Sequence, residues 1–425
     1  MPDADPLPPL RRNLEMMPSP VAGRPGLLIR DPYRYSEGIV IVPPPLVPYL
    51  LFFDGTRSEL DLREALVRAT GDLRVGSVIE GLAGTLSREG FLEDSRFAAI
   101  KGEKETAFAS ASRRSAVHAG SAYPAEARAL GEVLDAYMTP APGDPAPREG
   151  AEGALLDGLV GIAAPHVSPE GGWRAYRAAY AALGPEHRNR TFVILGTSHY
   201  GTPERFGLTR KPFSTPFGDA QVDLAVVDEL AAAAGDAVEM EDYCHSVEHS
   251  IEFQVVFLQH LFGPRVHIVP VLCGSFGRST MLGGRPEDDG RVARFLDALT
   301  GLHAREGGRL FYVLGVDMAH VGHRYGDAFS ARAGRGPLEE VERRDRLRMA
   351  RLVEGDAEGF WADVQVGGDE LRWCGSSPLY TFLRAVPSRA ELIRYEQWNI
   401  DDRSVVSFAG LAFRRPAGGR TPGAA

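Results

Sequence analysis

Several short apolar runs of this chain stop at side chains that can bind a metal or carry a proton. The runs and the residues that end them are 156–164 before His166, 191–197 before His199, 309–316 before Asp317 and His320, and 266–274, which ends with Cys273 instead. Short β-branched runs separated by helical patterns are typical of parallel strands in an α/β sheet. Such sheets bind ligands beyond the carboxyl ends of their strands. The sequence therefore predicts a pocket resembling that of an enzyme at this edge.

Composition narrows the class of protein. The 425 residues carry a formal net charge of -10, which argues against a nucleic-acid-binding surface because no basic face offsets phosphate repulsion. The three cysteines are too few and too scattered for a disulfide framework, and this suits a reducing compartment. The acidic, proline-broken N-terminus is unlike a signal peptide, and no stretch approaches the ~20 apolar residues of a membrane span. We expect a cytoplasmic protein with no nucleic-acid or membrane partner.

Two folded units are expected between loose ends. Residues 1–26 are proline-rich and residues 416–425 are rich in glycine and proline, so both are predicted to be disordered tails. Residues 27–98 combine two strand-like runs with two helical patterns, which suggests a small winged-helix-like α+β domain. Its positive and negative charges nearly balance and it has no stripe of basic residues, so we expect that it does not bind DNA. In residues 112–415 strands alternate with helices, which indicates the α/β unit.

The expected elements can be stated by range. In the first unit we predict strands at 27–30 and 39–42 and helices at 59–70, capped by Ser58 or Thr56, and at 76–89. In the second unit we predict helices at 125–138, 172–183, 223–235, 248–262, 291–304 and 338–354, and two late edge strands at 391–398 and 404–413.

His166 and His199 are the strongest candidates for metal ligands, because both directly follow predicted core strands. A lone core histidine is more often a hydrogen-bonded structural residue, but two at consecutive strand ends favour function. Asp317 and His320 lie three residues apart beyond another strand and would share a face if the chain turned helical there. Otherwise they would be a capping aspartate and a surface histidine.

Cys374 lies in a turn before a helix that Pro378 can start. A helix N-terminus favours the thiolate, which is the form that binds metals, although an isolated cysteine is more often structural. Glu248 and His249 open the predicted helix 248–262 and are assigned to the pocket. A zinc-protease pattern is excluded because Ser246, and not glutamate, follows His245.

Taken together, these motifs resemble the Memo family, including the AmmeMemoRadiSam system protein B. The matching segments are His118–Tyr123, Ala164–His166, Ile194–His199, Thr215–Asp219, Glu248–Glu252, Pro270–Leu272, Asp317–His320 and Cys374–Gly375. The resemblance implies a mixed sheet flanked by helices, similar to class III extradiol dioxygenases, and a cleft that binds iron or copper. It assigns His166, His199 and Cys374 as ligands, with Asp317 and His320 in the same pocket. Residues 27–98 loosely resemble PqqD-type peptide-binding modules found beside radical-SAM enzymes.

Two hypotheses follow for the cleft. In the first, the protein is a redox enzyme that holds iron, with copper or zinc as alternatives. His320 is its acid/base, and Asp317 orients His320. The enzyme acts on a peptide or a small molecule together with a radical-SAM partner. In the second, the same cleft is a non-catalytic binding site for a peptide or partner. The family usually has aromatic residues at or near the positions of Ala122 and Val167, so the cleft wall here carries fewer aromatic side chains, which favours the second hypothesis. The polar residues that match the family pattern favour the first.

Overall fold

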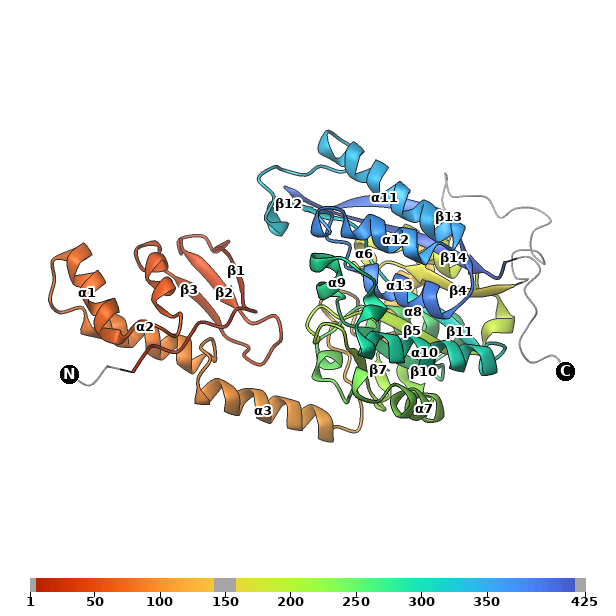
Figure 1. The fold of residues 1–425 in the computed structure, drawn as a ribbon, viewed down its shortest axis with the longest axis horizontal. Helices are drawn as coiled ribbons and strands as arrows, with labels where there is room; N and C mark the ends of the chain where they lie inside the picture. The colour runs from red at the N-terminus through yellow and green to blue at the C-terminus, as the bar shows by residue number, and fades with distance from the viewer. Residues whose placement is uncertain (1–4, 141–157, 417–425) are drawn as a thin grey trace. The chain divides into compact units, whose positions relative to one another are not determined.

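The chain forms two compact units, Met1–Ser110 and Ala111–Ala425. The computed structural model describes residues 5–140 and 158–416 (Figure 1). None of the helices in these ranges is long and apolar enough to cross a membrane.

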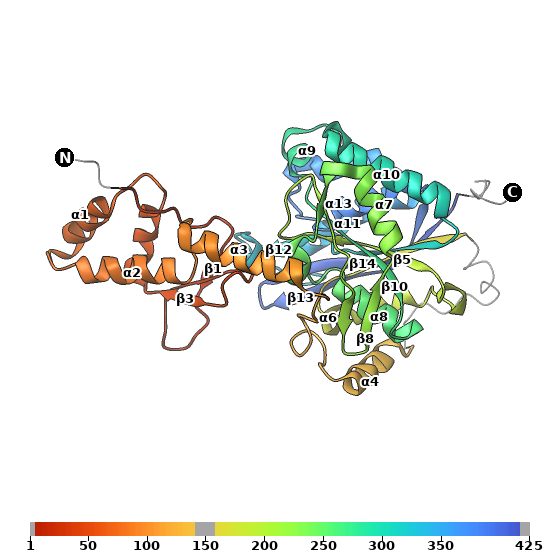
Figure 2. The same cartoon turned by 90° about the horizontal axis from the view of Figure 1, so that it is seen from below.

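The N-terminal unit is a three-stranded antiparallel sheet covered by helices (Figure 2). Its elements are β1 (Glu15–Pro18), β2 (Leu27–Arg30), β3 (Ile39–Val42), the 3-10 segment η1 (Pro44–Phe52), α1 (Glu59–Thr70), α2 (Gly76–Arg88) and α3 (Ser95–Ser110). Ser58 caps α1 in a reciprocal pair with Asp61, as the sequence indicated. Side chains from the sheet and helices, among them Ile29, Leu62 and Ile79, are buried in one core.

The prediction that residues 1–26 form a disordered tail is wrong for the described residues 5–26. β1 pairs with β2, and Leu7 is buried in the core of this unit. Arg11 forms a fully buried ion pair with Asp31, with nitrogen–oxygen distances of 2.9 and 3.1 Å, and donates a further hydrogen bond to the Gly90 carbonyl. Proline excludes a helix here but is tolerated on an edge strand, where no ladder donor is needed. Residues 1–4 and 417–425 lie outside the described ranges.

The second unit is built on an 11-stranded mixed sheet, which confirms the predicted α/β class. The strand order is β12 (His320–Gly322), β14 (Ser404–Arg414), β4 (Leu159–Ala164), β11 (Leu310–Gly315), β5 (Thr191–Thr197), β10 (His267–Cys273), β6 (Phe206–Leu208), β9 (Val238–Met240). Three further strands branch from this path. β13 (Arg389–Asp401) pairs with β14, and β8 (Gly218–Val222) pairs with both β10 and β7 (Phe213–Thr215). The four central strands β4, β11, β5 and β10 are parallel. Ala164, Gly315, Gly196 and Leu272 stand in one row across them, so the strands end together.

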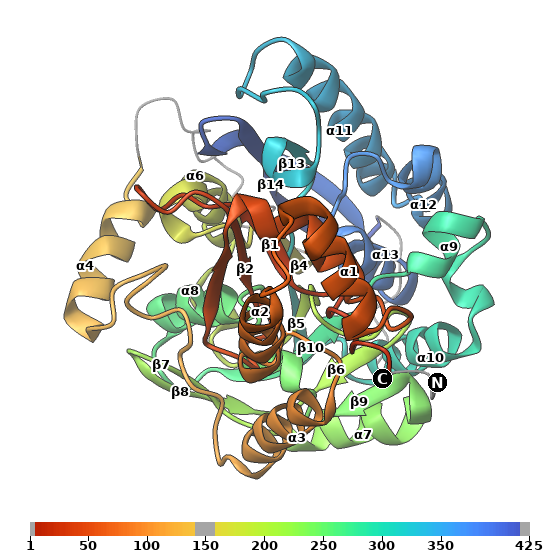
Figure 3. The same cartoon turned by 90° about the vertical axis from the view of Figure 1, so that its left-hand side faces the viewer.

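Helices cover both faces of this sheet (Figure 3). One face packs against α4 (Ala127–Met138), α6 (Pro169–Tyr180) and α8 (Glu252–Phe262), and the other against α7 (Leu224–Ala234), α10 (Gly290–Glu306), α11 (Pro337–Glu354), α12 (Ala357–Gln365) and α13 (Ser376–Ala385). Alternation along β5 decides the faces: Val193 and Leu195 join the second core, and Ile194 joins the first. Burial on both sides explains why the central strands read as continuous apolar runs.

Three expected local structures differ from those observed. The helix predicted at 248–262 begins at Glu252, because the Glu248 carboxylate accepts the backbone N–H groups of His249 and Ser250 and holds a turn there. The segment after β11 is extended, since His320 pairs with Val406 of β14. β14 is an interior strand and not an edge strand, because it pairs with β4, β12 and β13.

The buried Arg11–Asp31 pair generates the first prediction. Asp31→Ala should lower the free energy of unfolding by about 3–5 kcal/mol, because the guanidinium then stays buried without a counter-charge. Glu15→Ala removes the exposed partner of Arg30 in the same sheet and should cost no more than about 1 kcal/mol. Urea unfolding followed by circular dichroism measures both. Equal small losses would contradict a buried ion pair.

Candidate metal centre

Three histidines meet where the central strands end. His166 lies two residues beyond β4, His199 lies two residues beyond β5, and His249 lies in the turn before α8. One ring nitrogen of each lies within 4.8 Å of the others. The ring centroids are 5.0–5.1 Å apart in each of the three pairs. The in-register strand ends thus bring together imidazoles from distant parts of the chain.

Hydrogen bonds fix which nitrogen of each ring is free. Nδ1 of His166 is 2.9 Å from the Gly315 carbonyl oxygen, and Nδ1 of His199 and of His249 are 3.0 and 3.1 Å from Oε1 of Glu248. These oxygens only accept, so each Nδ1 carries a hydrogen, and Nε2 is the nitrogen that can coordinate a metal once it is deprotonated. Metal-binding histidines are commonly oriented in this way by a carbonyl or carboxylate.

Glu248 is the anchor of this cluster. Its carboxylate is buried and also accepts the backbone N–H groups of His199 and His249, at 2.9 and 2.8 Å. Burial would by itself raise the pKa of Glu248, but the charges and hydrogen bonds of the two imidazoles hold this pKa well below its ordinary value. Burial likewise opposes the charged form of His199, yet Glu248 raises the pKa of His199 well above its ordinary value. One ionised carboxylate therefore orients two rings.

Cys374 and Asp317 lie against His166. Nε2 of His166 is 3.3 Å from the Cys374 Sγ and 3.4 Å from Oδ2 of Asp317. Oδ1 of Asp317 accepts the backbone N–H groups of His166 and Val167 and so holds the loop after β4. The predicted ligands His166, His199 and Cys374 thus share one site, but the close trio of ring nitrogens contains His249 in place of the Cys374 sulfur. Ligation by Cys374 stays a prediction.

The protonation of Cys374 differs from the sequence-based expectation. Burial raises the pKa of the Cys374 thiol, although a hydrogen bond and charge from His199 lower it in part. Proximity to the start of α13 therefore does not make a free thiolate. Burial also raises the pKa of Asp317, against the opposing effect of His320.

His320 lies at the rim of the cluster. Its Nδ1 is 2.9 Å from the carbonyl oxygen of Met318 and 3.1 Å from that of Arg372, and its ring meets Tyr325 edge-on at 5.0 Å. These backbone oxygens orient His320, whereas Asp317 accepts hydrogen bonds from the His166 loop. Asp317 still interacts with His320 through its charge, and an orienting role of Asp317 toward His320 stays a prediction. Burial lowers the pKa of His320 to about 4, with Asp317 opposing. At neutral pH its Nε2 can accept a proton.

A buried arginine fixes the turn that carries His249. Arg114 donates hydrogen bonds to the carbonyl oxygens of His245 and Glu248, at 2.8 and 2.6 Å, and forms an ion pair with Glu252 in which both side chains are fully buried. His118, from the same segment, lies edge-on to His249 with ring centroids 5.6 Å apart. Sequence reasoning missed Arg114, because no local pattern marks a buried arginine.

A second buried carboxylate ties the loops of Cys374 and His320 together. Asp345 of α11 accepts hydrogen bonds from the Trp373 indole at 2.7 Å, the Tyr395 hydroxyl at 2.7 Å and the Ser407 hydroxyl at 2.6 Å. Trp373 precedes Cys374, and the Ser407 hydroxyl also accepts the backbone N–H of Ala319. Burial raises the pKa of Asp345 to about 6, against these three donors.

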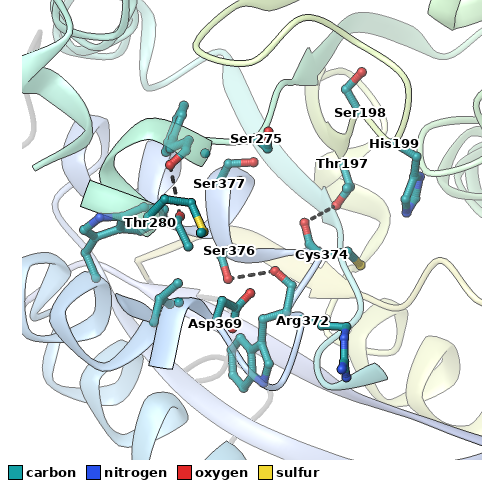
Figure 4. Close-up of a pocket in the computed structure, with 17 residues that line it drawn as sticks. Thr197, Ser198, His199, Ser275, Thr280, Asp369, Arg372, Cys374, Ser376 and Ser377 are labelled. Carbon is teal, nitrogen blue, oxygen red and sulfur yellow. Dashed lines mark hydrogen bonds between the residues drawn. The ribbon is translucent and has the colours of Figure 1, made fainter. Parts of the chain in front are cut away.

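A cavity of about 430 Å³ opens beside the cluster (Figure 4). His199 and Cys374 lie at one side of it, and the Thr197 hydroxyl donates to the Cys374 carbonyl at 3.0 Å. The remaining lining residues are Ser198, Ser275, Phe276, Gly277, Thr280, Met281, Trp361, Val364, Gly368, Asp369, Arg372, Trp373, Ser376 and Ser377.

The fold and the site together define an α/β protein with a histidine cluster able to hold a metal. The sequence model of the family described as Memo-like protein matches residues 114–412, and the chain belongs to this family. The cluster residues His166, His199 and His249 all lie inside the matched range.

Two MEMO1 family proteins support this assignment. A MEMO1 family protein of Aquifex aeolicus is 26% identical over 391 residues, covering 91% of this chain and 95% of the relative. Because the second unit begins at Ala111, an alignment of that length extends into the N-terminal unit. The Thermus thermophilus MEMO1 family protein TTHA0924 is 30% identical over 302 residues, covering 71% of this chain and 82% of the relative. The Escherichia coli K12 protein JW3007, a solved structure titled uncharacterized, overlaps 60% of this chain and 99% of its own with 12% identity and a TM-score of 0.37.

The role of Glu248 yields the second prediction. Glu248→Gln retains one acceptor oxygen and introduces an amide donor, so one of the two imidazoles loses its orienting carboxylate oxygen. The affinity for a divalent metal should fall about 10–100-fold, as measured by competition with a chromogenic chelator. Glu396→Gln, which changes a glutamate paired with Arg394 away from the cluster, should leave the affinity unchanged. Unaltered affinity in Glu248→Gln would exclude this orienting role.

The Asp345 network yields the third prediction. Asp345→Asn replaces one acceptor oxygen by an amide, so at least one buried donor loses its partner, and the free energy of unfolding should fall by about 1–3 kcal/mol. Asp363→Asn changes the partly exposed partner of Arg351 and should have an effect within about 1 kcal/mol. Chemical unfolding curves distinguish the two. A loss in Asp345→Asn no larger than in the control would refute the network's contribution.

Proposed function

We propose that this Memo-family protein is a metal-dependent oxidoreductase that holds non-haem iron at His166, His199 and His249, with the Cys374 thiol available as a further ligand. The observation that carries the proposal is the set of three imidazole nitrogens within 4.8 Å of one another. Mixed imidazole and thiolate donors suit iron, copper and zinc. Iron and copper are preferred over zinc by the family resemblance.

The donor set fits such an ion chemically. All three rings have Nδ1 held by an acceptor, which leaves Nε2 for coordination, and the Glu248 carboxylate supplies a buried negative charge beside two of the rings. Around Nε2 of His166 a sulfur and a carboxylate oxygen also gather. A bound iron or copper would supply one-electron redox chemistry at this point.

The chain itself would orient substrate and move a proton. His320 is neutral at physiological pH, because burial keeps its pKa near 4, and its Nδ1 hydrogen is held by backbone oxygens. Its Nε2 would accept a proton from a substrate bound beside the cluster. Asp317 would hold the loop of His166 in place through the backbone N–H groups of that loop.

We also propose that the substrate is a peptide or a small molecule and that the protein acts together with a radical-SAM enzyme. Support for this partner comes from the resemblance to the AmmeMemoRadiSam protein B. Turnover that requires both purified proteins would support the pairing. Full turnover by this protein alone would contradict the proposed radical-SAM partner.

Metal content and turnover in two variants form the fourth prediction. His166→Ala should lose most of its metal, because it removes one of three ring ligands. His320→Ala should keep the metal and lose turnover, because we assign it to proton transfer. His260→Ala, a partly exposed histidine of α8 beside Asp135, should change neither. Elemental analysis of protein purified without a metal-affinity tag, together with oxygen uptake, gives both readouts.

The same experiment separates the two hypotheses for the cleft. Metal loss in His166→Ala together with inactive His320→Ala supports the enzyme. Unchanged metal content in His166→Ala, combined with no oxygen consumption on any peptide or small-molecule substrate, leaves the non-catalytic binding protein as the better account.

A further inference from the structure

The loop of residues 367–373, which leads to Cys374, has a strained backbone. Asp369 and Arg372 of this loop have positive φ angles, of 59° and 52°. Only three other non-glycine residues in the described ranges share this left-handed conformation, which is unfavourable because the Cβ atom crowds the backbone carbonyl. Such a conformation persists only where surrounding contacts enforce it, and it is most frequent at functional sites. The contacts of Arg372 show what the conformation achieves here.

The backbone of Arg372 reaches His320 at two points. The Arg372 carbonyl oxygen lies 3.1 Å from Nδ1 of the His320 ring. The carbonyl oxygen of the preceding Leu371 accepts the backbone N–H of His320 at 2.8 Å. An extended residue at this position would turn these two carbonyl groups to opposite sides of the chain. The left-handed conformation of Arg372 therefore lets two successive carbonyl groups hold both the backbone and the ring of one histidine.

The side chain of Arg372 binds the same segment. Its guanidinium group donates to the His320 carbonyl oxygen at 3.1 Å. It also pairs with both carboxylate oxygens of Asp327, at 2.8 and 3.3 Å. Two-pronged pairs of this kind restrict geometry more narrowly than a single hydrogen bond does. One arginine thus fastens the loop before Cys374 to the segment that carries His320.

The pair between Arg372 and Asp327 also fixes the turn that carries Tyr325. The backbone N–H of Asp327 donates to the Gly322 carbonyl at 3.2 Å, and the Asp327 carboxylate accepts the Gly322 N–H at 2.8 Å. The Tyr325 ring meets the His320 imidazole edge-on, with centroids 5.0 Å apart. Arg372 therefore holds, through Asp327, the aromatic ring against which His320 packs.

We propose that Arg372 is the positioning residue of His320, and that its left-handed backbone and its two-pronged guanidinium together fix the imidazole beside the histidine cluster. The inference rests on the proposed function, in which His320 accepts a proton from the substrate. Lysine cannot replace this arginine, because an ammonium group on a flexible stem lacks the planar fork that binds both oxygens of Asp327.

Nuclear magnetic resonance of the full chain labelled with ¹⁵N-histidine tests this role. The His320 signals are assigned by their loss in His320→Ala. In the wild type we expect a protonated Nδ1 whose hydrogen exchanges slowly with water, because carbonyl oxygens hold it. Arg372→Ala, Arg372→Lys and Asp327→Asn should each speed this exchange by about three- to tenfold, the effect of weakening one hydrogen bond.

Controls separate positioning of His320 from general loosening of the fold. Arg384→Lys changes an arginine that pairs with Glu287 at similar exposure and should leave the exchange unchanged. In all variants the Nδ1 hydrogen of His166, which faces the Gly315 carbonyl, should exchange at the wild-type rate. Unchanged exchange at His320 in both Arg372→Lys and Asp327→Asn would overturn the proposal, and so would equal acceleration at His166.

The metal centre is measured separately. The affinity of Arg372→Lys for a divalent metal, determined by competition with a chromogenic chelator, should equal that of the wild type, because Gly315 and Glu248 orient the three clustered rings. A wild-type protein that bound no metal would refute the proposed function, whereas the exchange at His320 would still decide the role of Arg372.

Discussion

The in-register alignment of four parallel strands is the constraint on which the site depends. β4, β11, β5 and β10 are hydrogen-bonded side by side, and Ala164, Gly315, Gly196 and Leu272 share one row near their ends. The residues immediately beyond such a row must emerge at the same edge of the sheet. Because both faces of the sheet are covered by helices, a shift of register by one residue would move every buried side chain of a strand to the opposite face. The position of the histidines is therefore as strongly determined as the core.

Buried charged groups convert this common edge into a defined arrangement of side chains. Glu248 orients His199 and His249, Arg114 with Glu252 holds the turn between them and α8, and Asp345 connects the loops of Cys374 and Ala319. Each group is almost inaccessible to water, and each is surrounded by partners of opposite character. Burying a charge is costly, and satisfied hydrogen bonds offset that cost only in a narrow set of geometries. Such networks restrict the site to few conformations.

The cluster and the adjacent cavity share His199 and Cys374 but differ in chemistry. The cluster collects imidazole, carboxylate and thiol groups, whereas the cavity is bounded by aromatic rings, hydroxyl groups and already paired charges. The first arrangement suits a cation, and the second offers space for the body of a ligand. Their contact through two residues places the cavity next to the reactive groups.

The sequence alone determined the elements whose signal is local. Continuous apolar runs identified the central strands, because burial on both faces of a parallel sheet leaves an unbroken apolar segment that can be read from the chain. The polar residues that end these runs identified His166, His199 and Asp317. Only the tertiary structure decided the rest. The Glu248 carboxylate bonds to the backbone of its own turn and to two distant imidazoles, so His249 enters the cluster from a turn and not from the predicted helix. His320 lies in an extended segment because a strand more than 80 residues later pairs with it. Residues 5–26 are ordered in part because Arg11 forms a buried ion pair with Asp31. These outcomes depend on contacts between segments far apart in the chain, and local composition carries no information about such contacts.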